Sequence, residues 1–143
     1  MENVKIKFLN DKATLPTKGS VDSAGWDLYA AESVIIEPYQ TKKIGTGLSM
    51  ELPSNTFMAI YPRSGLASKQ GLRLANCVGV CDSDYRGEYC VVLYNDSSER
   101  RIVETGDRIA QAILQPYIPF EFETVEDLSD TERGEGGFGS TGV

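Results

Sequence analysis

Histidine is missing from all 143 residues of this chain. Its absence excludes serine-histidine and cysteine-histidine nucleophilic systems, and it removes the commonest general base found in enzymes. A hydrolase built on this sequence must therefore use a carboxylate, a lysine, a tyrosine or a metal-bound water as its base.

Cysteine is scarce, since the chain has only Cys77, Cys81 and Cys90. An odd number of cysteines without C-x-x-C spacing argues against a disulfide framework and against a zinc ribbon. Free cysteine behaves as a small hydrophobic residue, so we expect three buried thiols.

Long apolar runs and an excess of positive charge are lacking too. The opening residues MENVKIKF carry charge where a signal peptide has its apolar region, and no apolar run approaches the length of a membrane span. With 21 acidic against 14 basic residues, the net charge of −7 opposes non-specific binding to nucleic acid or to anionic lipid. The sequence therefore predicts a cytoplasmic protein of one domain that binds a small molecule.

The chain does contain a series of short apolar segments separated by Gly, Pro, Asn and Asp, which is typical of an all-β sandwich or barrel. The expected strands are residues 4–9, 34–36, 44–52, 57–61, 89–94, 109–114 and 120–125. Residues 64–70 are the expected short helix, ended by Gly71, and residues 24–32 have the propensity of a helical turn. We assign residues 1–127 to one β-barrel domain and residues 128–143 to a flexible arm, because the apolar pattern stops there.

The arm ends in RGEGGFGSTG at residues 133–142, with five glycines between positions 134 and 142. Successive glycines let backbone N–H groups turn toward an anion, and Arg133, Ser140 and Thr141 add donors. The spacing resembles a P-loop, but serine stands where the lysine belongs and no helix follows. The pattern indicates an anion-wrapping arm that closes over substrate, and a purely solvated terminus is the alternative.

A second candidate for phosphate binding is PRSGLA at residues 62–67. It places Arg63 and Ser64 after a strand and ahead of the expected helix, where a guanidinium fork and a hydroxyl can meet a phosphate. An ordinary strand-to-helix turn with a surface arginine is the alternative for this motif.

The candidate base lies in GVCDSDYRG at residues 79–87, which brings Asp82, Asp84 and Tyr85 together at a hairpin. Aspartate often occurs in hairpin turns for backbone reasons alone. Apolar residues on both sides nevertheless lead us to expect that Asp82 is rigid and partly desolvated, where it could act as a base.

Taken in order, five segments resemble the five sequence motifs of the trimeric dUTPase family and span residues 24–142. They read AGWDL, PRSGLA, GVCDSDYRG, GDRIAQ and RGEGGFGSTG. The resemblance implies a distorted jelly-roll or β-barrel subunit, a homotrimer, and hydrolysis of dUTP to dUMP and pyrophosphate with Mg²⁺.

The resemblance also implies residue roles. Asp82 would activate the water that attacks the α-phosphorus, and Asp27 would help to place the water and the metal shell. Mg²⁺ would be held by substrate phosphates and waters, with Asp27 reaching it through water. The implied substrate-binding residues are Arg63, Ser64, Gly65, Asn76, Gly79, Tyr85, Gln111, Arg133, Phe138, Gly139, Ser140 and Thr141.

Within that set, Tyr85 would lie against the deoxyribose, and Asn76 with the nearby backbone would meet the uracil edge. Phe138 would stack on the uracil as the arm closes. The resemblance further implies that each site takes its third motif from one subunit, the first, second and fourth from a neighbour, and the arm from the third subunit.

Two other functions stay open at this stage. A dCTP deaminase would share the fold, but it needs a carboxylate two residues before Tyr94-Asn95, where this chain has Val92, and it tends to carry Arg-Ser-Ser where this chain has Arg63-Ser64-Gly65. The second is a catalytically silent β trimer with a regulatory role, whose protein partner the sequence does not reveal. Cys81 stands where the family usually has isoleucine, so we expect bulky thiol reagents to inhibit if they reach it.

Overall fold

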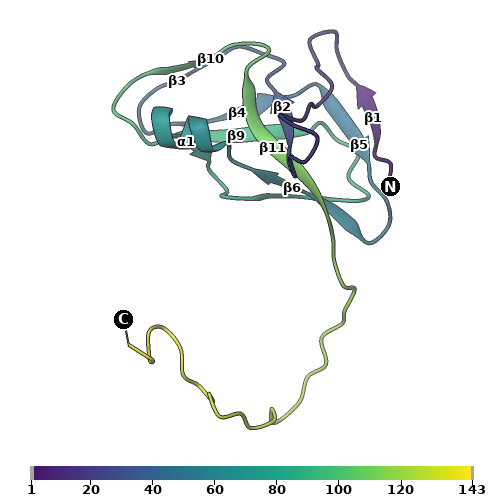
Figure 1. Ribbon diagram of the computed structural model, residues 1–143, viewed down its shortest axis with the longest axis vertical. Coiled ribbons are helices and arrows are strands. Elements are labelled where there is room, and N and C mark those ends of the chain that lie inside the picture. The colour runs from purple at the N-terminus through teal and green to yellow at the C-terminus, as the bar shows by residue number, and fades with distance from the viewer. Residues whose placement is uncertain (1, 143) are drawn as a thin grey trace.

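Alternating polar and apolar residues place the chain in short antiparallel strands, as the computed structural model of residues 2–142 shows (Figure 1). The strands are β1 (Lys5–Phe8), β2 (Trp26–Tyr29), β3 (Val34–Ile36), β4 (Thr41–Gly45), β5 (Leu48–Glu51), β6 (Thr56–Tyr61), β7 (Leu72–Leu74), β8 (Gly79–Asp82), β9 (Cys90–Asn95), β10 (Arg101–Val103) and β11 (Arg108–Pro116). The helix α1 spans Ser64–Gln70. The expected all-β subunit with one short helix is therefore confirmed.

The largest sheet has four strands in the order β2-β11-β6-β8. A three-stranded sheet, β4-β9-β7, and two pairs, β1-β5 and β3-β10, complete the fold. All of the pairings are antiparallel, so strands distant in sequence lie side by side. In particular, β11 lies between β2 and β6 and brings three separate segments of the chain together.

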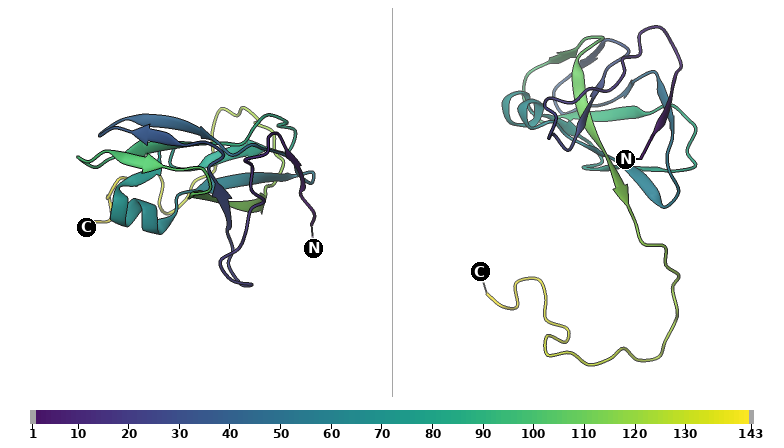
Figure 2. Two further views of the ribbon diagram at one scale, coloured as in Figure 1. Left: turned by 90° about the horizontal axis from the view of Figure 1, so that it is seen from above. Right: turned by 45° about the vertical axis from the view of Figure 1, so that its right-hand side comes forward.

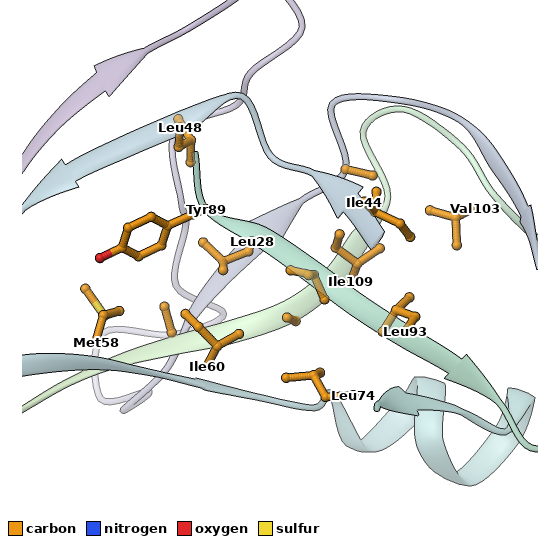
Figure 3. Packing of buried hydrophobic residues seen from close by; sticks show 14 of the residues in the cluster. Leu28, Ile44, Leu48, Met58, Ile60, Leu74, Tyr89, Leu93, Val103 and Ile109 are labelled. Carbon is orange, nitrogen blue, oxygen red and sulfur yellow. The ribbon is translucent and has the colours of Figure 1, made fainter. Parts of the chain in front are cut away.

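The core lies between the two larger sheets (Figure 3). Leu28 of β2, Ile44 of β4, Ile60 of β6 and Leu93 of β9 are each buried to 4% exposure or less. Burial of an aliphatic side chain of this size contributes about 1.5–3 kcal/mol, so these contacts fix the strands that carry the polar residues described below.

The helix ends as the sequence predicts. Gly71 adopts φ 66°, a left-handed conformation that favours glycine, and its N–H donates to the carbonyl of Leu66. No helix among residues 2–142 is long and apolar enough to cross a membrane.

Three expectations about the elements are wrong. Residues 44–52 form two strands, because the chain turns between β4 and β5 at Gly47, whose φ is 69°. Residues 24–32 contain the strand β2 and no helical turn, since pairing with β11 overrides the helical propensity. Residues 120–125 form no strand, and Phe120 and Phe122 are 73% and 91% exposed.

After Pro116 the chain leaves the strands and runs in a long curve below them (Figures 1 and 2). Short turns are its main local order: the amide of Gly136 donates to the carbonyl of Arg133, and the amide of Ser140 to that of Gly137. The described part of this segment, residues 117–142, is exposed almost throughout.

Candidate functional site

Asp27 forms the centre of a polar cluster on the four-stranded sheet. Its Oδ1 accepts from Arg63 Nε at 3.0 Å, and its Oδ2 lies 3.5 Å from Arg108 Nη1. Arg63 Nη1 also donates to the carbonyl of Arg108 at 3.2 Å. With only 15% of its side chain exposed, Asp27 is a half-buried carboxylate whose two oxygens each face an arginine.

Strand register explains why these residues meet. Gln111 of β11 pairs with Asp27 on one side and with Tyr61 on the other, so Arg63, two residues beyond Tyr61, comes within reach of Asp27. The sheet therefore joins the first, second and fourth of the motifs found in the sequence.

Gln111 strengthens this junction, because its Nε2 donates to the carbonyl of Pro62 at 2.8 Å. Gly25 lies so close to Gln111 that a Cβ at position 25 would collide with the side-chain oxygen Oε1. Ser64 and Gly65 open the helix beside this junction and are exposed, and a Cβ at Gly65 would meet nothing within 4 Å. Free space for a ligand thus borders the cluster.

Asp82 ends β8 on the face of the strand that points away from the core. Cys81 faces inward and packs against the core, while Asp82 is exposed. The expectation that Asp82 is partly desolvated is therefore wrong for the chain taken alone, since the alternation of β8 directs it to solvent.

The hairpin that follows Asp82 is fastened by its own polar groups. The amide of Tyr85 donates to the carbonyl of Asp82 at 3.2 Å, and Arg86 Nη1 donates to the carbonyl of Ser83 at 2.7 Å. Ser49 Oγ of β5 donates to the carbonyl of Arg86 at 2.7 Å. These bonds hold the turn beside Asp82 in one conformation.

Tyr85 lies across the backbone of Gly87, where an added Cβ would collide with the tyrosine ring and hydroxyl. Its hydroxyl donates to the carbonyl of Glu88 at 2.9 Å, and 45% of the residue stays exposed. Tyr85 is thus a partly exposed ring in the same turn as Asp82, whose carbonyl accepts from the Tyr85 amide.

Asn76 and Gly79 lie at the other end of β8. The carbonyl of Asn76 accepts from the amide of Val78 at 2.7 Å, and the Asn76 side chain is exposed. Gly79 pairs with Ile60, and a Cβ there would lie 3.1 Å from the Ile60 Cβ. Both residues leave polar groups at the surface.

One chain does not bring all of these residues together. Asp82 pairs with Phe57 at the start of β6, whereas Arg63 follows the end of β6. Six residues of extended chain separate Phe57 from Arg63, which corresponds to roughly 20 Å at about 3.3 Å per residue. Asp82 and the Asp27 cluster therefore lie at opposite ends of the same strand.

The predicted arm residues are remote from both groups along the chain. Arg133, Phe138, Gly139, Ser140 and Thr141 are at the surface, and Phe138 is fully exposed with φ 53°. Arg133 Nε donates to the carbonyl of Gly136 at 2.7 Å, within the arm itself.

The three cysteines are free thiols. Cys81 and Cys90 are half-buried, and burial raises the pKa of both thiols above the ordinary cysteine value. Cys77 is exposed, so the expectation of three buried thiols is wrong for that residue. Among residues 2–142, no group of three or more acidic or cysteine side chains is arranged to hold a metal ion.

Sequence reasoning missed several residues that shape these groups. Arg108 was not singled out, although it faces Asp27. Gly25 and Gly87 stand inside the motifs, and the structure shows that each leaves room for a neighbouring side chain. Nothing in the sequence marked Tyr89 as important, apart from its place in the expected apolar strand at residues 89–94.

Comparisons with known proteins agree with one another. Residues 11–142 match the model of the dUTPase family. The chain is 50% identical over 139 residues to the deoxyuridine 5'-triphosphate nucleotidohydrolase of Nautilia profundicola, covering 97% of this chain and 98% of that protein. Its structure is similar to that of a dUTPase of Staphylococcus bacteriophage 80alpha with dUPNHPP, with a TM-score of 0.89, 29% identity and coverage of 100% of both chains.

The fold is also shared with the dUTPase from phage phi11 of S. aureus. The TM-score is 0.83 at 21% identity, over 90% of this chain and 99% of that one. That phage protein is described with a structural Mg(II) ion.

Proposed function

Because the chain belongs to the dUTPase family and hydrolyses dUTP, we propose that Asp82 is the general base of this reaction. Its carboxylate accepts no hydrogen bond among the described residues and stands at the end of a strand fastened to the core. Asp82 takes the proton of the attacking water, which then adds to the α-phosphorus and releases pyrophosphate. A positioned base of this kind contributes about 10²- to 10⁴-fold in rate.

Tyr85 selects the sugar in this proposal. Its partly exposed ring stands in the same hairpin as Asp82, and a deoxyribose packs against it where a ribose 2′-hydroxyl has no room. Asn76, which is exposed, and the backbone at Gly79, which lies on the edge strand β8, meet the uracil edge. A buried polar group left unpaired by cytosine would weaken binding of dCTP.

The junction of the first, second and fourth motifs holds the phosphates. Arg63 uses two of its five N–H donors on Asp27 and on the carbonyl of Arg108, so three donors stay free for phosphate oxygens. The remaining donors are the hydroxyl of Ser64, the amide of Gly65 and the side chain of Gln111. Asp27 accordingly acts mainly by orienting Arg63.

Mg²⁺ accompanies the triphosphate in this proposal. It prefers oxygen ligands and keeps several waters, and both oxygens of Asp27 already face arginines, so this carboxylate fits contact through water rather than direct ligation. Bound Mg²⁺ would neutralise charge on the phosphates. The residues around it orient the phosphates and exclude bulk water.

The complete site requires a homotrimer. The separation of roughly 20 Å between Asp82 and the Asp27 cluster supports a site shared between subunits, because at about 3.3 Å per residue one chain cannot place both beside one phosphate group. The arm, with Arg133 and Phe138 exposed, would close over a neighbouring site.

Exposed apolar residues between β11 and the arm support the same assembly. Phe120 and Phe122 alternate with Glu121 and Glu123, and β1 offers an unpaired strand edge with alternating lysines. An apolar groove next to β1 contains Ile6 and Met58 among its lining residues. Phe120 and Phe122 would be covered by this edge of a second subunit.

The division at residue 127 into domain and arm, the mobility of the arm and the cytoplasmic location stay predictions. The family match favours hydrolysis over the dCTP deaminase and silent-trimer alternatives.

The function is tested with purified protein and Mg²⁺ by following pyrophosphate release from dUTP, dCTP, dTTP and UTP. Only dUTP should be consumed rapidly. Deamination of dCTP, or a protein that binds dUTP and leaves it uncleaved, would contradict the proposal.

A further inference from the structure

Tyr89 is a buried tyrosine whose hydroxyl has no hydrogen-bond partner among the described residues. The residue is 2% exposed. Its amide donates to the carbonyl of Leu48 at 2.8 Å, and its carbonyl accepts from Thr46 Oγ1 at 2.6 Å, so the backbone is fixed. An unpaired buried hydroxyl costs stability relative to an apolar group of the same shape. Hydrogen bonding of the hydroxyl therefore does not explain why a tyrosine ring is buried at this position.

The ring lies next to the hairpin that carries the proposed base, because its centroid is 5.9 Å from that of Tyr85. Figure 3 shows it between Leu48 and Met58, with the hydroxyl oxygen at the end away from Leu28. Met58 pairs across β6 and β8 with Cys81, the inward-facing neighbour of Asp82. Tyr89 thus fills the space under the end of β8.

Tyr89 also supports Tyr85 from below. The two ring centroids lie 5.9 Å apart with an angle of 41° between the ring planes. This separation is within the range in which aromatic pairs attract each other, and tilted geometries are favoured over face-to-face stacking. Tyr85 therefore rests on the backbone of Gly87 and on the ring of Tyr89, and its hydroxyl is tied to the carbonyl of Glu88.

Of these three supports, only the Tyr89 ring is a side chain. The other two use the backbone of the hairpin, which moves with Tyr85 itself. Tyr89 directly precedes β9, which is packed into the core through Val91 and Leu93. Because the core holds Tyr89 in place, contact with its ring can fix the tilt of the Tyr85 ring.

We propose that Tyr89 is a positioning residue for substrate selection, whose buried ring holds the Tyr85 ring at the tilt that excludes a ribose 2′-hydroxyl. The inference rests on the proposed role of Tyr85 in sugar selection. Without the Tyr89 ring, Tyr85 would rock toward the core and leave space for the hydroxyl of UTP.

The hydroxyl of Tyr89 takes no part in proton transfer. Burial is the main cause that raises its pKa above the ordinary tyrosine value, so the group stays neutral at physiological pH. The ring alone carries the positioning role.

The test compares Tyr89→Leu, which removes the ring, with Tyr89→Phe, which keeps it. Values of kcat and KM are measured separately for dUTP and UTP, together with the melting temperature. In Tyr89→Leu, the ratio of kcat/KM for dUTP to that for UTP should fall roughly three- to tenfold, the factor that corresponds to an aromatic pair. Tyr89→Phe should keep the ratio and melt no lower than the original protein.

Tyr94→Leu is the matched control. Tyr94 lies on β9, the strand that follows Tyr89, and its ring centroid is 5.0 Å from the guanidinium carbon of Arg73. Its loss should lower the melting temperature and leave the dUTP to UTP ratio unchanged. If Tyr89→Leu does not fold, Tyr89→Met replaces it, because methionine fills irregular space without supplying a ring.

Tyr85→Ala separates the two proposals. If Tyr85→Ala lowers the ratio and folded Tyr89→Leu does not, the role of Tyr89 is wrong while the role of Tyr85 stands. If Tyr85→Ala leaves the ratio unchanged, sugar selection by Tyr85 is wrong, and the inference fails with it.

Discussion

The two aspartates of the site differ in what their oxygens contact. Both oxygens of Asp27 face arginines, whereas Asp82 is exposed and its carboxylate accepts no hydrogen bond among residues 2–142. A carboxylate committed to arginines is suited to orienting them, and a free carboxylate on a rigid strand end can take a proton. The two residues therefore divide orientation and base catalysis between them.

Replacement of Asp82 by asparagine tests this division. Asp82→Asn keeps the size of the side chain and removes its basicity, so kcat should fall by about 10²-fold or more while nucleotide affinity changes little. Pyrophosphate release measures the first quantity, and calorimetric titration with a non-hydrolysable dUTP analogue measures the second. Asp84→Asn, two residues along the same hairpin, is the control and should stay active. Substantial turnover by Asp82→Asn would remove Asp82 from its assigned role.

Thiol labelling should follow exposure and pKa. A thiol reacts as the thiolate, and the raised pKa of Cys81 and Cys90 lowers their thiolate fraction near neutral pH. Exposed Cys77 should be alkylated first, and labelling of Cys81 should increase as the pH rises. Timed alkylation followed by peptide mass spectrometry gives the order. Loss of activity should increase with the extent of Cys81 labelling. Full activity of protein fully modified at Cys81 would contradict the expectation that a bulky group beside Asp82 inhibits.

At the scale of elements, local patterns predicted most of the fold. Residues 34–36 and 64–70 were predicted at their observed bounds, because apolar patterning and the glycine at position 71 are local signals. Residues 24–32 were not, since pairing of β2 with β11 decides their structure, and residues 120–125 have the pattern of a strand but pair with none of the described strands. The ion pairs of Asp27 could not be predicted from the sequence either, because strand register, and not spacing along the sequence, brings Arg63 and Arg108 to that carboxylate.

The junction of the first, second and fourth motifs depends on Gly25, which lies in the loop before β2. In Gly25→Ala, the new Cβ would push aside Gln111 Oε1 and weaken the hydrogen bond to the Pro62 carbonyl. Loss of such a bond costs about 0.5–1.5 kcal/mol, and KM for dUTP should rise roughly two- to tenfold. Gly19→Ala is the control, because its Cβ would make only an ordinary contact of 3.7 Å with Ser23 Oγ. Equal KM values for the two variants would show that the junction does not position the phosphate donors.

The C-terminal arm should contribute to catalysis and not to folding. Removal of residues 133–143 takes away the glycines, Arg133 and Phe138, and it leaves the net charge at −7 because Glu135 is lost with Arg133. None of residues 133–142 is part of the buried core, so the melting temperature should stay within a few degrees. Steady-state kinetics should show a fall in kcat/KM of about 10²-fold, the size expected for loss of several phosphate donors. An active truncated protein would show that the arm does not close over substrate.

At the scale of the whole molecule, a shared site allows two inactive chains to complement each other. Asp82→Asn lacks the base, and the chain without residues 133–143 lacks the arm. If hairpin and arm come from different subunits, refolding an equal mixture should restore about a quarter of the sites. Half of the sites receive a hairpin with Asp82, and half of those receive an intact arm. Pyrophosphate release by the mixture, compared with each variant refolded alone, gives the answer. A mixture as inactive as its components would place hairpin and arm in one subunit.

The long curve that the chain follows after Pro116 also governs how these molecules behave toward one another in solution. Residues 117–143 contain seven acidic residues and one arginine, whereas residues 1–116 contain 14 acidic and 13 basic residues. Nearly all of the electrostatic repulsion between neighbouring molecules therefore originates in residues 117–143. Proteolytic clipping near residue 117 would leave a particle close to its isoelectric point at neutral pH, which migrates slowly in native electrophoresis and precipitates readily.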